Sequence, residues 1–513
     1  MTASSTSSLS PTEPTIREEI RAIAKLSAPI SLAQVALVAM GLVDTAILGR
    51  ESVDDLAAAG LARSVGFAAL SFGLGIAAAL EPLAAQAIGA RQPNRAWKAQ
   101  TSAFAAIAIA WPLMVLGSLA STFVLPRFGV EATVVDRARL FLLGQAPGQL
   151  LFLAFLVAKT FLQAHGNTSP ALVATGAANV VNFIACQLFV RGDDALRSLH
   201  LPPIGLPKLG AFGAGCSSSV ASLALFGVVW LAARRFRPTD VSDAGPTSHG
   251  PVRSRPPANL LGAASRETAG PTSHGPSSDE VGVRQVLAVG LPIGFQMLAE
   301  IGVFSMCALH AGEFGARAES AHQIALGLAS FTFMGALGVS AGTAVRVGLA
   351  VGEGRSPRRI GLVGIGVGAG VQLFGALIFT FFPEFLAARF SQDPAVIRLG
   401  GQLLYIAAIF QLFDGMQAVA GGALRGVGDV HAAFLLNVFS HWCVGYPIAL
   451  ALAYGSGDLS RYNPSKYIAI LLHTHDGLGV RGLWIGLTAG LVTVALTMSG
   501  RFLVLSRRTI ARL

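Results

Sequence analysis

Hydrophobic stretches long enough to cross a membrane recur along almost the whole chain, and shorter polar segments separate them. A bilayer core about 30 Å thick requires about 20 apolar residues in a helix, and these stretches reach that length. They do not alternate over about 10 residues, as membrane-spanning strands do. The pattern predicts twelve transmembrane helices, at residues 24–49, 57–89, 101–125, 139–163, 170–190, 211–233, 283–309, 322–350, 360–383, 396–424, 430–454 and 478–504.

One long polar segment divides these helices into two groups of six. Residues 234–282 are rich in Pro, Gly, Ser and Thr, and the motif AGPTSHGP occurs twice within them. Low complexity of this kind is typical of a disordered linker. The predicted parts are an N-terminal tail (1–23), a first lobe (24–233), this linker, a second lobe (283–504) and a C-terminal tail (505–513).

The two groups of six resemble each other in sequence. When the second is aligned on the first, Pro292 matches Pro29 and Gly312 matches Gly49. Two six-helix halves of the same orientation form a parallel repeat, which is typical of transporters whose halves rock about a central site. The sequence therefore predicts an all-α polytopic membrane protein, with twelve transmembrane helices in two pseudo-symmetric six-helix lobes.

The composition agrees with a membrane protein. Charged residues make up 12% of the chain, against about 25% in a typical soluble protein, and the mean hydropathy is +0.62. The net charge of +10 is not gathered into a basic patch with interleaved aromatic residues, so no nucleic-acid partner is predicted. The four cysteines lie apart in apolar stretches, and neither disulfides nor a metal site are predicted.

The predicted orientation follows from lysine and arginine, which concentrate in the cytoplasmic loops of membrane proteins. Their bias toward one side comes mostly from the two tails and the central linker. We therefore expect a multi-pass protein of the cell inner (plasma) membrane, surrounded by bilayer lipid, with both termini in the cytoplasm. We expect it to be a monomer.

Four acidic residues lie inside the predicted helices, where an ionised side chain costs at least about 2.5–3.5 kcal/mol. They are Asp44, Glu81, Glu300 and Asp414. An acid at this depth is a functional candidate by default, and the alternative is an acid that a neighbouring amide satisfies to join two helices. The repeat duplicates none of the four, so any ion site they form is asymmetric between the lobes.

Amide side chains accompany these acids at helical spacing. Gln411 and Gln417 lie three residues before and after Asp414, and Gln296 lies one turn before Glu300. The predicted cavity-lining residues are Gln34, Glu81, Asn179, Asn182, Gln296, Gln411 and Gln417. Asn179 and Asn182 can equally join helices.

Buried carboxylates suggest a transport mechanism. In low-dielectric surroundings a carboxylate can hold a proton near neutral pH, or two carboxylates and amide oxygens can coordinate Na⁺. A cationic substrate competes for the same negative site. Ion entry from outside then expels substrate, which is antiport by mutually exclusive occupancy, and no cofactor besides the coupling ion is required.

Four segments resemble the multidrug and toxic compound extrusion (MATE) transporters. They are APISLAQVALVAMGLVDTAILGR, GIAAALEPLAAQAIGAR, GTAVRVGLAVGEGR and LFDGMQAVAGGALRGVGD. They are similar to the family's first, second, eighth and tenth spans, and the likeness covers nearly the whole chain. The resemblance implies two six-helix lobes, a V-shaped cavity between them, and export of small organic cations by antiport with Na⁺ or H⁺. It implies cation-linked roles for Asp44 in the first lobe and for Glu300 and Asp414 in the second.

The chain departs from the family at two positions. Phe410 occupies a place where some members have an aromatic hydroxyl. One prokaryotic branch has an Asn and an Asp four residues apart in span 5, and the equivalents here are Asn182 and Cys186. Because that first-lobe acid is missing, the acids of the second lobe become stronger candidates for the ion site.

Two other functions are open to a chain of this kind. A flippase for polyisoprenoid-linked sugars or lipids would share the architecture but would require a cationic cavity, and few Lys or Arg lie within the predicted spans. An intramembrane aspartyl protease would use two facing Asp from separate spans, whereas Asp429 follows Arg425 in a loop shortly after Asp414. We therefore expect a transporter and not an enzyme.

Overall fold

The structure is a computed structural model that describes residues 15–128, 130–198, 200, 202–238, 281–456, 468, 470 and 476–513. Twelve helices in these ranges are long and apolar enough to cross a membrane. The predicted fold class, an all-α polytopic membrane protein, is therefore confirmed.

The helices fall into two lobes. The first lobe contains α1 (Ile16–Glu51), α2 (Val53–Ala78), α3 (Leu80–Gly89), α4 (Pro93–Ser121), α5 (Ala132–Ala164), α6 (Ser169–Arg191), α7 (Asp193–Ser198) and α8 (Gly210–Ala233). The second lobe contains α9 (Val283–Glu313), α10 (Ala316–Gly352), α11 (Arg358–Phe381), α12 (Pro383–Ala387), α13 (Pro394–Val427), α14 (Val430–Val438), α15 (Tyr446–Tyr454) and α17 (Val480–Leu505). A π-helical turn, Phe439–Gly445, joins α14 to α15 within one span.

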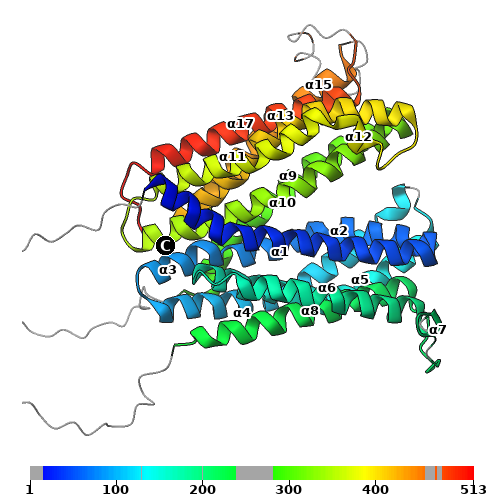
Figure 1. The fold of residues 1–513 in the computed structure, drawn as a ribbon, viewed down its shortest axis with the longest axis horizontal. Helices are drawn as coiled ribbons and strands as arrows, with labels where there is room; N and C mark the ends of the chain where they lie inside the picture. Colours follow the sequence, from blue (N-terminus) through cyan, green and yellow to red (C-terminus); the bar gives the residue numbers. More distant parts are fainter. Residues whose placement is uncertain are drawn as a thin grey trace, which may run out of the picture.

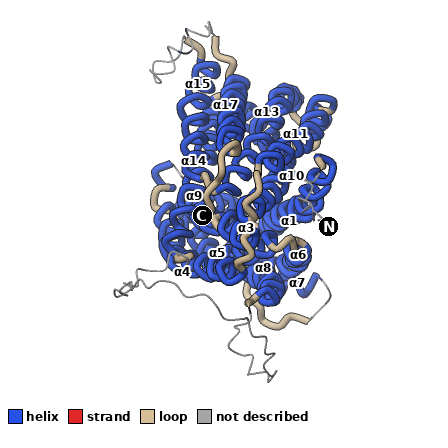
Figure 2. Tube along the Cα trace, turned by 90° about the vertical axis from the view of Figure 1, so that its left-hand side faces the viewer, coloured by secondary structure: helices blue, strands red, loops and turns tan. Residues whose placement is uncertain are grey.

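The two lobes lie side by side and converge at one end. In Figure 1 the first lobe is below and the second above, and their helices approach each other at the left, where the chain ends, and diverge toward the right. Figure 2 looks onto the converging end and shows α3, α9 and α10 between the outer helices of the two lobes. We call this end, which carries the start of α1 and Leu513, the terminal end.

The first helix is longer than the hydrophobic pattern predicts. It begins at Ile16 and not at residue 24, because Thr15 and Glu18 form a capping box that satisfies free backbone N–H groups. Most of the added residues are exposed, but Glu19 is buried and forms an ion pair with Arg346 of α10 (Oε2 to Nη2, 2.6 Å). Of the predicted tail and linker, residues 1–14 and 239–280 lie outside the described residues.

The predicted second span, residues 57–89, is divided into two helices, α2 and α3, that meet at Ala79. Pro82 explains the division, because proline has no N–H to donate to Ala78 and its ring clashes with that carbonyl. Glu81 consequently lies in the first turn of α3, at the level where the lobes converge.

Glycines allow the lobes to touch backbone to backbone near the terminal end. A Cβ added to Gly75 of α2 would lie 2.3 Å from the backbone nitrogen of Gly294 and 2.4 Å from the carbonyl oxygen of Gly290, both in α9. A Cβ on Gly89 of α3 would lie 2.2 Å from the carbonyl oxygen of Leu349 in α10. Small residues permit this close packing in membranes, and we call these contacts the glycine seam.

Candidate ion and substrate site

The two acids predicted for the second lobe, Glu300 and Asp414, line the same cavity of about 970 Å³. Glu300 comes from the middle of α9 and Asp414 from α13. Residues of α10 line a further side, and Leu61 and Ser64 of α2 border the cavity from the first lobe. The pair therefore faces the space between the lobes.

Asp414 is buried without a partner. It is 7% exposed and makes no hydrogen bond or ion pair with any other described residue. The charged group that acts on it is Glu300, which has the same sign. A buried unpaired carboxylate costs several kcal/mol, so this arrangement favours the uptake of a proton or a cation.

Glu300 is held by two amides. Its Oε2 accepts hydrogen bonds from Gln417 Nε2 (3.3 Å) and from Asn437 Nδ2 (3.2 Å). The carbonyl oxygens of both amides, Gln417 Oε1 and Asn437 Oδ1, are buried and have no hydrogen-bond partner. Carboxylate and amide oxygens are ligands that hard cations prefer, so these three side chains and Asp414 could hold Na⁺. The sequence prediction included Gln417 but missed Asn437, whose signal is an amide inside the apolar eleventh span.

A second cavity, of about 610 Å³, lies between the lobes and shares Glu300 with the first. Four predicted residues line it: Gln34, Glu81, Gln296 and Gln417. Glu81 forms an ion pair with Arg425 of α13 (Oε2 to Nε, 3.0 Å), which joins the two lobes. Arg425 also donates a hydrogen bond to Ser340 Oγ (3.1 Å). The expectation that Arg425 lies in a loop is wrong, because α13 continues to Val427.

Lys159 of α5 also lines the second cavity and was missed by the sequence prediction. It is 7% exposed, and its ammonium lies 5.9 Å from the centre of the Phe155 ring. The residues predicted at this depth were acids and amides, and no lysine was among them. Lys159 and Arg425 thus add two cations to a cavity for which only acids and amides were predicted.

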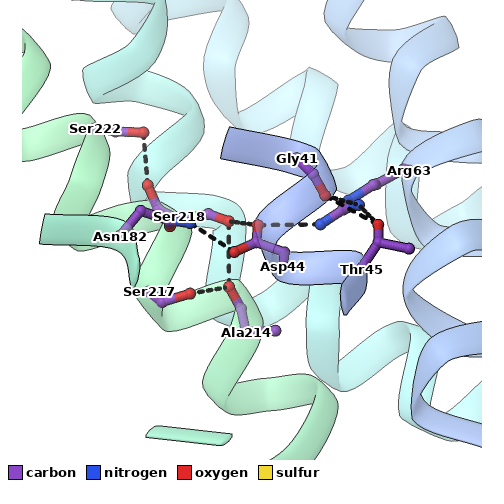
Figure 3. Close-up of polar contacts among 9 residues, drawn as sticks. All are labelled: Gly41, Asp44, Thr45, Arg63, Asn182, Ala214, Ser217, Ser218 and Ser222. Atoms are coloured by element: carbon purple, nitrogen blue, oxygen red, sulfur yellow. Dashed lines mark hydrogen bonds and ion pairs between the residues drawn. The ribbon is translucent and has the colours of Figure 1, made fainter. Parts of the chain in front are cut away.

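Asp44 lies in a separate polar cluster within the first lobe (Figure 3). Its Oδ1 accepts a hydrogen bond from Asn182 Nδ2 (2.6 Å), and its Oδ2 forms an ion pair with Arg63 Nη2 (3.0 Å) and a 3.4 Å hydrogen bond with Ser218 Oγ. Cys186 interacts with the same carboxylate. Arg63 therefore already supplies the positive charge that a cation would bring.

Two predicted cavity residues lie in helix contacts. Asn179 donates hydrogen bonds to the carbonyl oxygens of Ala36 in α1 (2.9 Å) and Thr175 (2.8 Å). Gln411 Oε1 accepts hydrogen bonds from Gln372 of α11 (2.7 Å) and Thr332 of α10 (2.8 Å). These two amides connect helices, which is the alternative noted for Asn179.

Comparison with known proteins shows to which family the chain belongs. The family model described as MatE matches residues 29–188 and again residues 292–451. Each matched segment lies within one lobe, which agrees with the predicted repeat. The chain is a membrane transporter and not an enzyme, and it belongs to the multidrug and toxic compound extrusion (MATE) family.

Curated relatives and solved structures extend the comparison. The chain is 32% identical to a probable multidrug resistance protein NorM of Bradyrhizobium diazoefficiens, over 95% of this chain and 93% of that protein. It is 30% identical to the multidrug resistance protein NorM of Burkholderia vietnamiensis, over 93% and 92%. A Vibrio cholerae MATE transporter, VcmN, has the same fold, with a TM-score of 0.75 at 16% identity over 96% of this chain and 98% of that one.

Proposed function

We propose that this transporter exports organic cations, including cationic or amphipathic drugs, toxins and metabolites, in exchange for Na⁺ or H⁺. The observation that carries the proposal is the acidic pair of Glu300 and Asp414, which share one cavity and form no ion pair with a described cation. The names of the relatives, multidrug resistance proteins, support a drug substrate.

The same oxygens would serve ion and substrate in turn. A proton on Asp414, or Na⁺ held by Glu300, Asp414 and the free carbonyl oxygens of Gln417 and Asn437, removes the negative charge that attracts a cationic substrate. Occupancy by one therefore excludes the other. Exchange follows if the lobes expose this site alternately to the two sides of the membrane.

Asp44 has a secondary place in this proposal. Its carboxylate pairs with Arg63 and does not border the two cavities described above. It could bind a coupling ion only if Arg63 moved away. We therefore assign it to the support of the first lobe, with Asn182 and Ser218, and assign coupling to the second lobe.

The proposed orientation puts both chain ends in the cytoplasm of a monomer in the cell inner membrane. The inter-lobe ion pair Glu81–Arg425 and the glycine seam lie toward the terminal end, where the lobes converge. In that orientation the convergent end faces the cytoplasm, and the lobes diverge toward the outside. The structure would then correspond to the state that releases substrate and takes up the ion.

The test is efflux of ethidium from a drug-sensitive strain that lacks its main exporters, under imposed gradients of Na⁺ and of H⁺. We expect the wild type to export ethidium with one of the two gradients. Glu300→Gln and Asp414→Asn each remove a carboxylate from the cavity and should each lower the coupled rate at least tenfold.

Two matched variants control for the loss of any acid. Glu131→Gln and Asp136→Asn make the same chemical changes at exposed positions outside the cavity and should export normally. Normal export by both cavity variants would refute the ion-site assignment. A wild type that moves no cationic dye under either gradient would refute the substrate class.

A further inference from the structure

The side chain of Lys159 presents an ammonium to the second cavity, and its contact there is the face of the Phe155 ring at 5.9 Å. Lys159 makes no hydrogen bond or ion pair with another described residue, although it is 7% exposed. A buried ammonium without a partner costs several kcal/mol. Nothing in the proposed exchange of cations uses this group, since it repels a cationic substrate.

Other hydrogen-bond donors lie on the same face of α5. Gln163 follows Lys159 by one helical turn, is 1% exposed, and has an amide nitrogen without a hydrogen-bond partner. Thr160 lines the cavity beside them. A lysine and an amide with unused donors, on one face of a helix, are complementary to an oxyanion.

The charges at this end of the cavity do not balance. Glu81 is the carboxylate that acts on Lys159, and it is already paired with Arg425 at 3.0 Å. Two cations thus share one carboxylate, which leaves one net positive charge. Glu300 lines the same cavity and adds a negative charge to it, apart from these two cations.

We propose that Lys159, Gln163 and Thr160 form a subsite for the carboxylate of a transported zwitterion whose cationic group lies at Glu300. The subsite rests on the proposed function, because it assumes that the cavity carries substrate and that Glu300 attracts its cation. It adds to the proposed organic cations those molecules that carry a carboxylate as well as a cationic group. Arg425 of the second lobe lines the same cavity and adds its positive charge, although it remains paired with Glu81.

The test uses two fluorescent ligands that differ in one group. Tetramethylrhodamine is a zwitterion with a free carboxylate, and its methyl ester is a cation without one. Binding of each to the purified full chain in nanodiscs is followed by fluorescence polarisation, for the wild type and for Lys159→Met. Since a charge-assisted hydrogen bond accounts for roughly tenfold in affinity, we expect Lys159→Met to weaken the acid about tenfold and the ester less than twofold.

Three further variants make the result specific. Lys159→Arg keeps the charge and should retain most of the preference for the acid. Gln163→Leu removes the second donor and should weaken the acid but not the ester. Lys208→Met makes the same substitution at an exposed lysine outside the cavity and should change neither affinity. Unchanged ester binding shows that a variant is folded.

The possible outcomes separate this inference from the proposed function. If Lys159→Met binds both ligands as the wild type does, the subsite is refuted while cation export stands. If neither ligand binds the wild type and no cationic dye is exported, the proposed function is refuted, and the subsite, which rests on it, is refuted as well. A lipid phosphate is another oxyanion that could bind at Lys159. The titration is therefore repeated in nanodiscs that contain phosphatidylglycerol. If this lipid weakens binding of the acid in the wild type but not in Lys159→Met, the subsite holds a lipid headgroup and the proposal is wrong.

Discussion

Glu81 of the first lobe and Arg425 of the second form an ion pair across the lobe interface, with 3.0 Å between Oε2 and Nε. Both side chains are mostly buried, and Arg425 is fixed further by Ser340. Removing one partner of a buried pair costs about 3–5 kcal/mol. Since this pair exists only while the lobes converge at the terminal end, its loss favours states in which that end is open.

The first prediction concerns the distance between the lobes. Glu81→Gln should shift the population at least tenfold toward the open terminal end. Spin labels at Asn94 and Ser356, which are exposed at that end of each lobe, would report longer distances in a background whose four native cysteines are replaced. Arg501→Gln breaks an ion pair within the second lobe and should leave the distance unchanged.

A charge exchange sharpens this prediction. Glu81→Arg combined with Arg425→Glu restores opposite charges at the two positions and should recover part of the short distance. If the single and double variants open to the same extent, the ion pair does not hold the lobes together.

The second prediction concerns the coupling ion. Asn437→Leu removes one of the two amides that contact Glu300 and one free carbonyl oxygen. Groups that support a metal site typically change its affinity 10- to 100-fold, so the Na⁺ or H⁺ concentration for half-maximal efflux should rise about tenfold. Asn94→Leu, at an exposed position in the first turn of α4, is the matched control. Unaltered ion dependence in Asn437→Leu would exclude a role for this amide.

The third prediction concerns the polar cluster of the first lobe. Arg63→Met leaves Asp44 buried without its cation, and we expect a loss of about 2 kcal/mol, below the usual range for buried pairs because Arg63 is 32% exposed. The loss should appear as a lower midpoint of thermal unfolding in detergent. Adding Asp44→Asn removes the orphaned charge and should restore part of the stability. If the double variant is less stable than Arg63→Met, the charge is not the cause.

The fourth prediction concerns the glycine seam. Gly75→Ala places a Cβ 2.3 Å from the backbone of α9, so the lobes must separate or the helices must shift. We expect lower thermal stability by about 1–3 kcal/mol. Gly176→Ala is the control, because no atom lies within 4 Å of its added Cβ. Equal stability of the two variants would contradict the close contact.

The helices could be predicted from the sequence because lipid imposes a minimum apolar length on every span. The repeat could be predicted because both halves retain matching landmarks such as Pro29 and Pro292. The division of the second span was missed, although Pro82 is its signal. The hydrophobic pattern shows that an apolar stretch exists, but it does not show whether that stretch forms one continuous helix or two consecutive helices.

The site was predicted in part. Helical spacing put Gln411 and Asp414 on one stripe, but at about 100° per residue they stand about 60° apart. That angle is enough for Gln411 to face α11 while Asp414 faces the cavity. Lys159 could not be assigned to the site from sequence alone, because a lysine near the end of a span often reaches the interface. Only the packing of α5 shows that it borders the cavity.

The glycine seam has a mechanical consequence. Where Gly75 meets Gly290 and Gly294, main chain faces main chain, and the rings of Phe72 and Phe295 meet edge to face beside that contact. Rotation of one lobe against the other then requires little side-chain repacking at the glycines themselves, and the contacts that oppose it are the Phe72–Phe295 ring pair and the Glu81–Arg425 ion pair. A single bulky substitution at Gly75 can therefore block the movement of the lobes, because the facing main chain leaves no space for a side chain.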